Sequence, residues 1–435
     1  MARFEDVLDN LCQQEMLGQL RALFPNKELL VVRDVAGKCR IYANVTRAEI
    51  GDDEARIDRI EDELRSALGA FAGSPLITFL DELLFPGELF GRSHSILKRD
   101  RGFTIRIFER GVMGEEWDIC KTVEHRDKPK RVVFWGFKGG VGRSTALIAA
   151  ACHLARAKGK NVLVFDFDLE SPGISSTLLG PKDLPKYGVV DWFVEDAAGQ
   201  ADDRLVGDML MRSALGGDGW VKVVPAHGCN FENYLSKLNR CYLATSLDES
   251  WAERMNRMVG QVEEIEKPDI VFIDSRAGLQ DIAASAVTSL GAHTLLFAVD
   301  SRQTWEGYRL LFSYWHRKMQ EDMELYDSLT RNLFPFMKVV AGLVPETEVE
   351  GYLTSFREHS YNLFSDNLYQ ETTDEPDVFN FDVGDEDAPH YPLLVNWTRR
   401  LQEFDPLQSP DFLHEPLVRV AFEDFFTKFE EWLEK

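Results

Sequence analysis

The sequence has 435 residues, of which 44% are hydrophobic and 28% charged, which is the length and composition of a globular protein with two or three domains. The net charge is −24, and residues 345–435 alone hold 22 Asp and Glu against 6 Lys and Arg, a difference of 16. Because such a surface repels DNA phosphates and anionic lipids, direct nucleic-acid binding and a membrane partner are disfavoured, and a protein partner with a basic face is favoured.

Targeting and redox features point to the cytoplasm. No apolar run reaches the length of about 18 residues that a membrane span needs, and the opening residues 1–6 do not resemble a signal peptide. The six cysteines are scattered, without a Cys-x-x-Cys pair. This pattern indicates reduced thiols and argues against a disulfide scaffold, a zinc site or an iron–sulfur site.

Residues 1–128 predict a small α+β domain, which we interpret as a recognition or regulatory module. Apolar residues at helical spacing predict a helix that carries Ile57 and Leu64. Two hairpins are expected, one from 29–33 with 40–45 and one from 104–108 with 116–119. The polar, proline-containing stretch 121–130 predicts a linker to the rest of the chain.

A glycine-rich loop follows, between an apolar strand at 132–135 and a helix that begins near Ala146. Glycines let backbone N–H groups point inward, and the following helix N-terminus adds positive potential, so such a loop cradles phosphate oxygens. A cation and a hydroxyl directly after the last glycine match the Walker pattern. The loop residues are Lys138, Gly139, Gly140, Val141, Gly142, Arg143, Ser144 and Thr145.

Two further strands end in carboxylates. The strand at 162–166 ends in Asp166 and is followed by Asp168, which places both carboxylates at the carboxyl edge of a parallel sheet beside the phosphate loop. A lone Asp at such a position more often caps a helix, but the pair behind a phosphate loop favours function. Asp274 ends the apolar strand 270–274 as in a Walker B motif, where the Asp can hold Mg²⁺ through water. Arg276, two residues on, is equally consistent with a phosphate sensor and with a surface residue.

The remaining elements complete an α/β pattern. Strands are expected at 220–226 and 293–300, a helix at 303–320, and a last strand at 336–345. Residues 365–390 are acidic and predict an exposed loop. The chain ends in an amphipathic helix with Val418, Phe422 and Phe429 on one face, whose acidic character favours docking on its own core or on a partner over membrane binding.

These motifs resemble those of the ParA/MinD-type P-loop ATPases, which carry a deviant Walker A motif. The resemblance covers roughly residues 130–345, and Phe-Lys-Gly-Gly-Val-Gly-Arg-Ser is similar to a subgroup found in bacterial signalling and conflict proteins. Two departures stand out: Arg143 replaces the P-loop Lys of the family, and Phe137 replaces the first Gly of a general Walker A motif. The resemblance implies a P-loop NTPase fold, with a mostly parallel sheet covered by helices on both faces. Together with the flanking segments described above, it divides the chain into three expected parts: an N-terminal domain (1–128), the ATPase domain (129–345) and an acidic helical extension (346–435).

The resemblance also assigns roles and the cofactors ATP and Mg²⁺. The amides of 139–144 and the Arg143 side chain would hold the phosphates, and Ser144 with Asp274 would hold Mg²⁺, supported by Asp166. Asp168 would orient or activate the attacking water, and Lys138 would reach the ATP of a second subunit. The Asn that helps the family to read adenine is absent from the last loop, so ATP over GTP rests on the resemblance.

Three functions are consistent with the sequence. The leading hypothesis is a weak ATPase that acts as a nucleotide-dependent dimerisation switch on a protein partner, in bacterial signalling or antiviral defence. The alternative is a nucleotide-binding scaffold or sensor subunit without useful hydrolysis. A DNA-partitioning ATPase is the third, and the negative charge argues against it.

Overall fold

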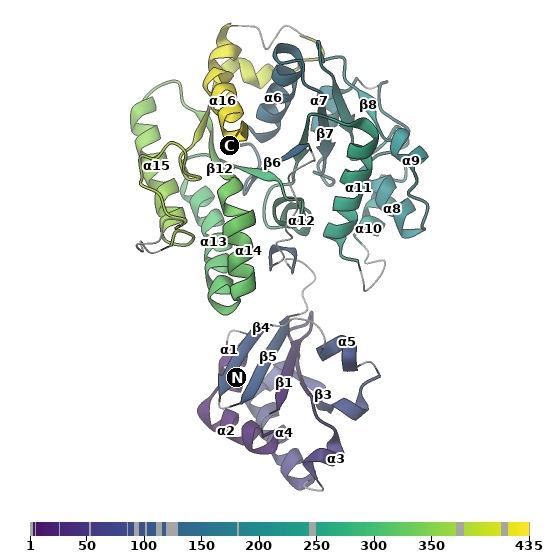
Figure 1. The fold of residues 1–435 in the computed structure, drawn as a ribbon, viewed down its shortest axis with the longest axis vertical. Helices are drawn as coiled ribbons and strands as arrows, with labels where there is room; N and C mark the ends of the chain where they lie inside the picture. Colours follow the sequence, from purple (N-terminus) through teal and green to yellow (C-terminus); the bar gives the residue numbers. More distant parts are fainter. Residues whose placement is uncertain are drawn as a thin grey trace. The chain divides into compact units, whose positions relative to one another are not determined.

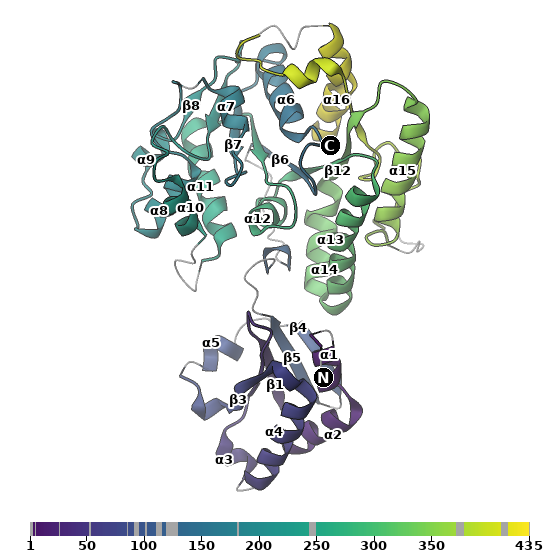
Figure 2. The ribbon, with the colours of Figure 1, turned by 180° about the vertical axis from the view of Figure 1, so that it is seen from behind.

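The computed structural model describes residues 3–4, 6–25, 27–51, 54–84, 86–90, 95–100, 102–109, 115–118, 129–180, 182–242, 249–370, 378–409 and 416–434. The chain divides into two compact units, Met1–Met113 and Gly114–Lys435, and each is described here by itself (Figures 1 and 2). In the described residues, no helix is long and apolar enough to cross a membrane.

The first unit is a five-stranded mixed sheet with helices packed on it. The sheet order is β3-β2-β1-β5-β4, in which β1 and β2 form an antiparallel pair and β1 and β5 a parallel one. The strands are β1 (Glu28–Arg33), β2 (Cys39–Ala43), β3 (Ala72–Phe79), β4 (Ser95–Asp100) and β5 (Phe103–Glu109). The helices are α1 (Asp6–Leu11), α2 (Gln14–Leu23), α3 (Arg47–Ile50), α4 (Glu54–Leu68) and α5 (Pro86–Phe90), with 3₁₀ turns η1 (Gly69–Phe71) and η2 (Leu80–Glu82). The helix carrying Ile57 and Leu64 is α4, and it buries both side chains in the core of this unit.

One of the two predicted hairpins is confirmed and the other is wrong. β1 and β2 pair as expected. β5 instead pairs with β4, which precedes it, and residues Glu115–Asp118 form a 3₁₀ turn, η3. The reason is Trp117: its buried ring packs against Trp135 and Trp315, so this segment belongs to the core of the second unit. The linker expected at 121–130 lies almost wholly outside the described residues.

The second unit is an eight-stranded sheet covered on both faces. Its order is β13-β12-β11-β6-β10-β7-β9-β8, and every pair is parallel except β8 with β9. The strands are β6 (Lys130–Gly136), β7 (Val162–Asp166), β8 (Met211–Arg212), β9 (Val221–Val224), β10 (Ile270–Asp274), β11 (His293–Ala298), β12 (Met337–Val344) and β13 (Leu393–Asn396). Six of them are buried along their whole length or all but one residue, as expected for parallel strands with helices on both sides.

The helices divide between the two faces. One face carries α6 (Arg143–Ala157), α7 (Ile174–Leu178) and α16 (Pro416–Glu434), which share one apolar cluster (Figure 1). The other carries α8 (Val189–Ala197), α10 (Tyr234–Cys241), α11 (Trp251–Glu266), α12 (Asp281–Ser289), α13 (Arg302–Glu321), α14 (Met323–Asn332) and α15 (Val349–Ser365). The remaining pieces are α9 (Asp203–Gly207), η4 (Phe334–Phe336) and η5 (Arg399–Glu403). The fold class predicted from the sequence is therefore confirmed.

Two expectations for the C-terminal region need correction. The strand at 336–345 is not the last, because β13 pairs with it in parallel at the sheet edge. The exposed loop expected at 365–390 is found only in part: residues 378–390 contain no helix or strand and Asp382, Glu386 and Asp387 are exposed, but Phe379 and His390 are buried and ring pairs join Tyr369 to both of them. Residues 371–377 lie outside the described residues. The acidic residues suggested exposure, but the aromatic residues between them decide how the segment packs. The terminal helix docks on its own core, where Phe422, Phe425 and Phe429 are buried.

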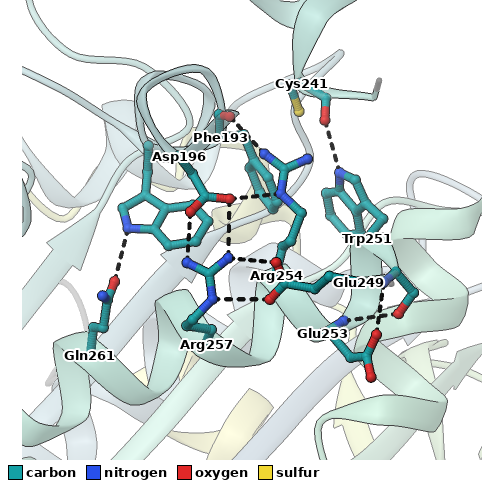
Figure 3. A network of polar contacts seen from close by, with 11 residues as sticks. Phe193, Asp196, Cys241, Glu249, Trp251, Glu253, Arg254, Arg257 and Gln261 are labelled. Carbon is teal, nitrogen blue, oxygen red and sulfur yellow. Dashed lines mark hydrogen bonds and ion pairs between the residues drawn. The ribbon is translucent and has the colours of Figure 1, made fainter. Parts of the chain in front are cut away.

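A network of charges holds α8 against α11 on the second face (Figure 3). Arg254 is 1% exposed and donates from Nε to Asp196 at 2.7 Å and from Nη2 to the Phe193 carbonyl at 2.7 Å. Arg257 donates to the other oxygen of Asp196 at 2.6 Å and reaches Glu249 at 2.8 Å. A buried guanidinium is tolerated here because hydrogen-bonded partners compensate its charge.

Candidate functional site

The glycine-rich loop joins β6 to α6 as predicted. β6 ends at Gly136, and α6 begins at Arg143 after Gly142, whose φ of 82° lies in the left-handed region that glycine tolerates. Gly139 and Gly140 are exposed, and a Cβ on either would meet nothing within 4 Å. The loop thus leaves open space over its backbone, next to the N-terminus of a 15-residue helix.

Neighbouring elements fix the two sides of the loop. Val141 is buried, and its carbonyl would lie 2.0 Å from a Cβ at position 342, so only Gly342 lets β12 approach it. Phe137 packs its ring on Gly307 of α13, where a Cβ would lie 2.1 Å from the ring. The departure from the Walker pattern at Phe137 therefore has a structural partner, and sequence reasoning had no signal for Gly307.

Three carboxylates lie beside the loop at the carboxyl edge of the sheet. Asp166 and Asp274 end neighbouring strands in register, and Asp168 follows two residues after the first. Ser144 donates from Oγ to Asp274 Oδ2 at 3.1 Å. Ser175, near the start of α7, donates to Asp166 Oδ2 from its hydroxyl at 2.6 Å and from its backbone N–H at 3.3 Å. One oxygen of Asp166, Oδ2, therefore accepts hydrogen bonds from the start of α7, as a helix-capping Asp would.

Burial raises the pKa of all three carboxyls. For Asp166, burial and then the charge of Asp274 raise the pKa to about 7. For Asp274 and Asp168, burial raises the pKa while the charge of Arg143 opposes the rise. Perturbed carboxyls gathered beside a phosphate-type loop are typical of a functional site.

Arg143 does not extend into the space above the loop but turns to two of these carboxylates. Its Nε donates to Asp274 Oδ1 at 2.9 Å and its Nη2 to Asp168 Oδ2 at 3.2 Å. The side chain is 10% exposed, and within the part of the chain that the structure describes its Nη1 has no hydrogen-bond partner. The structure therefore brings Arg143, Ser144, Asp168 and Asp274 together, with Asp166 behind them.

The oxygen donors suit a hard divalent cation such as Mg²⁺. Ser144 Oγ and the Asp274 carboxylate supply hydroxyl and carboxylate oxygens, and Asp166 Oδ1 is buried without a partner among the described residues. The described residues contain no group of three or more His, Cys, Asp or Glu arranged to enclose a metal by themselves. This combination fits Mg²⁺ that is bound by few protein ligands together with substrate phosphates.

Lys138 and Arg276 lie at the edges of this site. Lys138 Nζ donates to Gln303 Oε1 of α13 at 2.5 Å, so it is held within its own subunit. Arg276, 27% exposed, pairs with Glu170, and Tyr242 also donates to Glu170 at 2.5 Å. Arg276 thus ties the loop after β10 to the loop after β7, a contact that single-motif reasoning missed because neither Glu170 nor Tyr242 belongs to a recognised pattern.

A cavity of about 330 Å³ opens next to the loop. Its walls come from the start of α6, from α7, and from the η5 segment, which contributes Leu401, Gln402 and Phe404. Ser144, Asp168 and Asp274 line one end. No sequence pattern indicates η5 in this position, because the chain reaches it through the unpredicted strand β13, which directly precedes it.

A search of curated proteins found no match. Among solved structures, a ParA family ATPase from Chlorobium tepidum is similar at 12% identity with a TM-score of 0.44, covering 68% of this chain and 98% of that one. The cell division ATPase MinD from Pyrococcus furiosus is similar at 16% identity and a TM-score of 0.41, covering 69% and 98%. Cobyrinic acid a,c-diamide synthase from Mycobacterium smegmatis, solved with an ATP analogue and magnesium, is similar at 18% identity and a TM-score of 0.36, covering 53% and 82%.

The sequence also matches a family. The family described as the CobQ/CobB/MinD/ParA nucleotide-binding domain matches residues 132–373, more than half of the 435 residues. This span includes the glycine-rich loop and all three carboxylates. The chain therefore belongs to the CobQ/CobB/MinD/ParA family of nucleotide-binding proteins, as its ParA/MinD-like motifs predict.

Proposed function

We propose that the chain is an ATPase with slow turnover that dimerises on binding ATP and thereby regulates a protein partner. The observation that carries this proposal is the connection from Ser144, in the glycine-rich loop, to Asp274 at the end of β10. In P-loop ATPases, phosphoryl transfer depends on positioning and charge stabilisation, and the loop amides, this pair and Asp168 supply those groups. When bound, Mg²⁺ would be held by Ser144 and Asp274 and would neutralise charge on the phosphates.

The remaining residues take roles around the triphosphate. The open amides of 139–144 cradle the phosphates. Asp168, whose Oδ2 accepts a hydrogen bond from Arg143, positions the attacking water. Lys138 acts across a two-fold interface once it leaves Gln303. The negative net charge favours a partner with a basic face, and the resemblance to the subgroup suggests signalling or antiviral defence as its setting.

The dimer is tested with Lys138→Ala. Light scattering with ATP should show dimers for the wild type and monomers for the variant, while nucleotide affinity remains because the loop amides are unchanged. Lys160→Ala, an exposed lysine beyond the far end of α6, serves as the matched control and should still dimerise. Dimers that persist in Lys138→Ala would exclude this arrangement.

A non-hydrolysing scaffold is the second candidate, and the ion pairs of Arg143 favour it. Both Asp168 and Asp274 already hold a guanidinium, which reduces their freedom to act on water or metal. Steady-state turnover of ATP and GTP with Mg²⁺, measured beside nucleotide binding, separates the two. Turnover that falls in Asp168→Ala supports the switch, whereas tight binding without turnover supports the scaffold. A partitioning ATPase would be retained on non-specific DNA at low salt with ATP, and we expect no retention.

A further inference from the structure

Arg143 places a buried positive charge between two carboxylates of the site. The guanidinium bridges Asp274, at the end of β10, and Asp168, in the loop after β7, and it lies almost entirely out of solvent. Arginine keeps its charge at every relevant pH and presents its donors in a rigid planar fork. A lysine at the same place would offer one flexible point charge. Nε and Nη2 each donate a hydrogen bond here, whereas Nη1 has no partner among the described residues.

The same contacts engage both oxygens of Asp274. Its Oδ1 receives Arg143 Nε and its Oδ2 receives the Ser144 hydroxyl, and the carboxylate is only 2% exposed. A divalent cation that approaches Asp274 closely must compete with a hydrogen-bonded guanidinium and is repelled by its charge. Phosphate oxygens are attracted by that same charge. Nη1, which is buried and has no partner among the described residues, carries part of it.

We propose that Arg143 itself supplies the positive charge that a bound metal ion would otherwise place between the phosphates and the Asp168–Asp274 pair. Nucleoside triphosphate then binds with little dependence on Mg²⁺. This inference rests on the proposed nucleotide-binding function and goes beyond it, because it names the state in which the nucleotide is recognised. Mg²⁺ can still join the bound triphosphate, but it is not required for binding.

The test is isothermal titration calorimetry of the full chain with the non-hydrolysable analogues AMP-PNP and GMP-PNP, each with Mg²⁺ and with EDTA. The quantity of interest is the ratio of Kd in EDTA to Kd in Mg²⁺. For the wild type we expect a ratio below about threefold, and for Arg143→Lys a ratio of about tenfold or more, or about 1.4 kcal/mol of binding free energy. The inference is overturned when the ratio for Arg143→Lys is less than about threefold larger than the ratio for the wild type.

A second measurement does not need nucleotide. Electron paramagnetic resonance of free Mn²⁺ reports its binding to the wild type and to Arg143→Gln, whose neutral side chain leaves the carboxylates without a cation. We expect Arg143→Gln to bind Mn²⁺ about tenfold more tightly than the wild type, and the double variant Arg143→Gln with Asp274→Asn to lose that gain. Equal Mn²⁺ affinity in wild type and Arg143→Gln would contradict the inference, even if Arg143→Lys did not bind nucleotide.

The outcomes separate this inference from the proposed function. If the wild type binds neither analogue under either condition, the nucleotide-dependent switch itself is refuted, and the inference with it. If the wild type binds an analogue only when Mg²⁺ is present, the proposed function stands and Arg143 does not replace the metal charge.

Discussion

Asp166 should make the stability of the second unit depend on pH. Its side chain is fully buried, and burial together with the charge of Asp274 raises its pKa from 3.8 to about 7. Between these two values the folded protein holds a proton that the unfolded chain releases. Stability therefore falls as pH rises through this window, and the full cost of ionising the buried carboxyl is present only above pH 7.

Asp166→Asn removes this titration while keeping an oxygen that can accept from Ser175. Each pH unit between the two pKa values corresponds to about 1.36 kcal/mol of unfolding free energy. The buried carboxyl therefore lowers the stability of the wild type by about 4 kcal/mol at pH 8 and by about 1.7 kcal/mol at pH 5. The new amide N–H groups lose water at a cost that is the same at both pH values. The stability of the variant relative to the wild type should thus be about 2.5 kcal/mol greater at pH 8 than at pH 5.

Urea unfolding in EDTA, followed by tryptophan fluorescence, measures this difference. All nine tryptophans lie between residues 117 and 432, so the signal reports the second unit alone. Asp218→Asn, at an exposed position, is the control and should differ from the wild type equally at both pH values. A pH-dependent difference for Asp166→Asn below about 1 kcal/mol would refute the reasoning that burial keeps this carboxyl protonated.

Three further substitutions test the packing of the second unit. Gly342→Ala places a Cβ 2.0 Å from the Val141 carbonyl, so nucleotide affinity should fall while circular dichroism stays unchanged; retained affinity would mean that the loop can shift. Asp196→Ala leaves Arg254 buried without its carboxylate and should cost about 3–5 kcal/mol in urea unfolding, and a cost under about 1 kcal/mol would show that the network is dispensable. Phe429→Ala should cost a similar 3–5 kcal/mol or so, because its ring is buried under the sheet, and a stable variant would show that α16 is not part of the core.

The fold of the second unit was predictable because its signals are local. Buried parallel strands are continuous apolar runs, and β6, β7, β10 and β11 each read as one, while the loop before α6 has glycines where the backbone needs them. β13 was missed because its four residues have no partner in the neighbouring sequence and gain their place from β12 and α16. The 3₁₀ turn η3 was missed for a related reason: Trp117 decides its place through contacts with Trp135 and Trp315.

The site was predictable as a set of residues and not as a set of contacts. Motifs named Arg143, Ser144, Asp168 and Asp274, since each follows a strand or opens a helix at one edge of the sheet. The direction of the Arg143 side chain depends on carboxylates 25 and 131 residues away, and the sequence does not encode such a choice in any local pattern. Gln303 as the partner of Lys138 is likewise set by the packing of α13.

These side-chain contacts connect the two proposed properties of the protein. Lys138 is bound to Gln303, and Arg143 is bound to two carboxylates, so both cations nearest the loop are engaged within the chain. A triphosphate at the loop is attracted to both charges. Arg143 can act through its charge without leaving its carboxylates, whereas Lys138 must give up Gln303 to act elsewhere. Binding would therefore depend mainly on the loop and Arg143, and dimerisation on the release of Lys138, which allows the two steps to be separated by substitution.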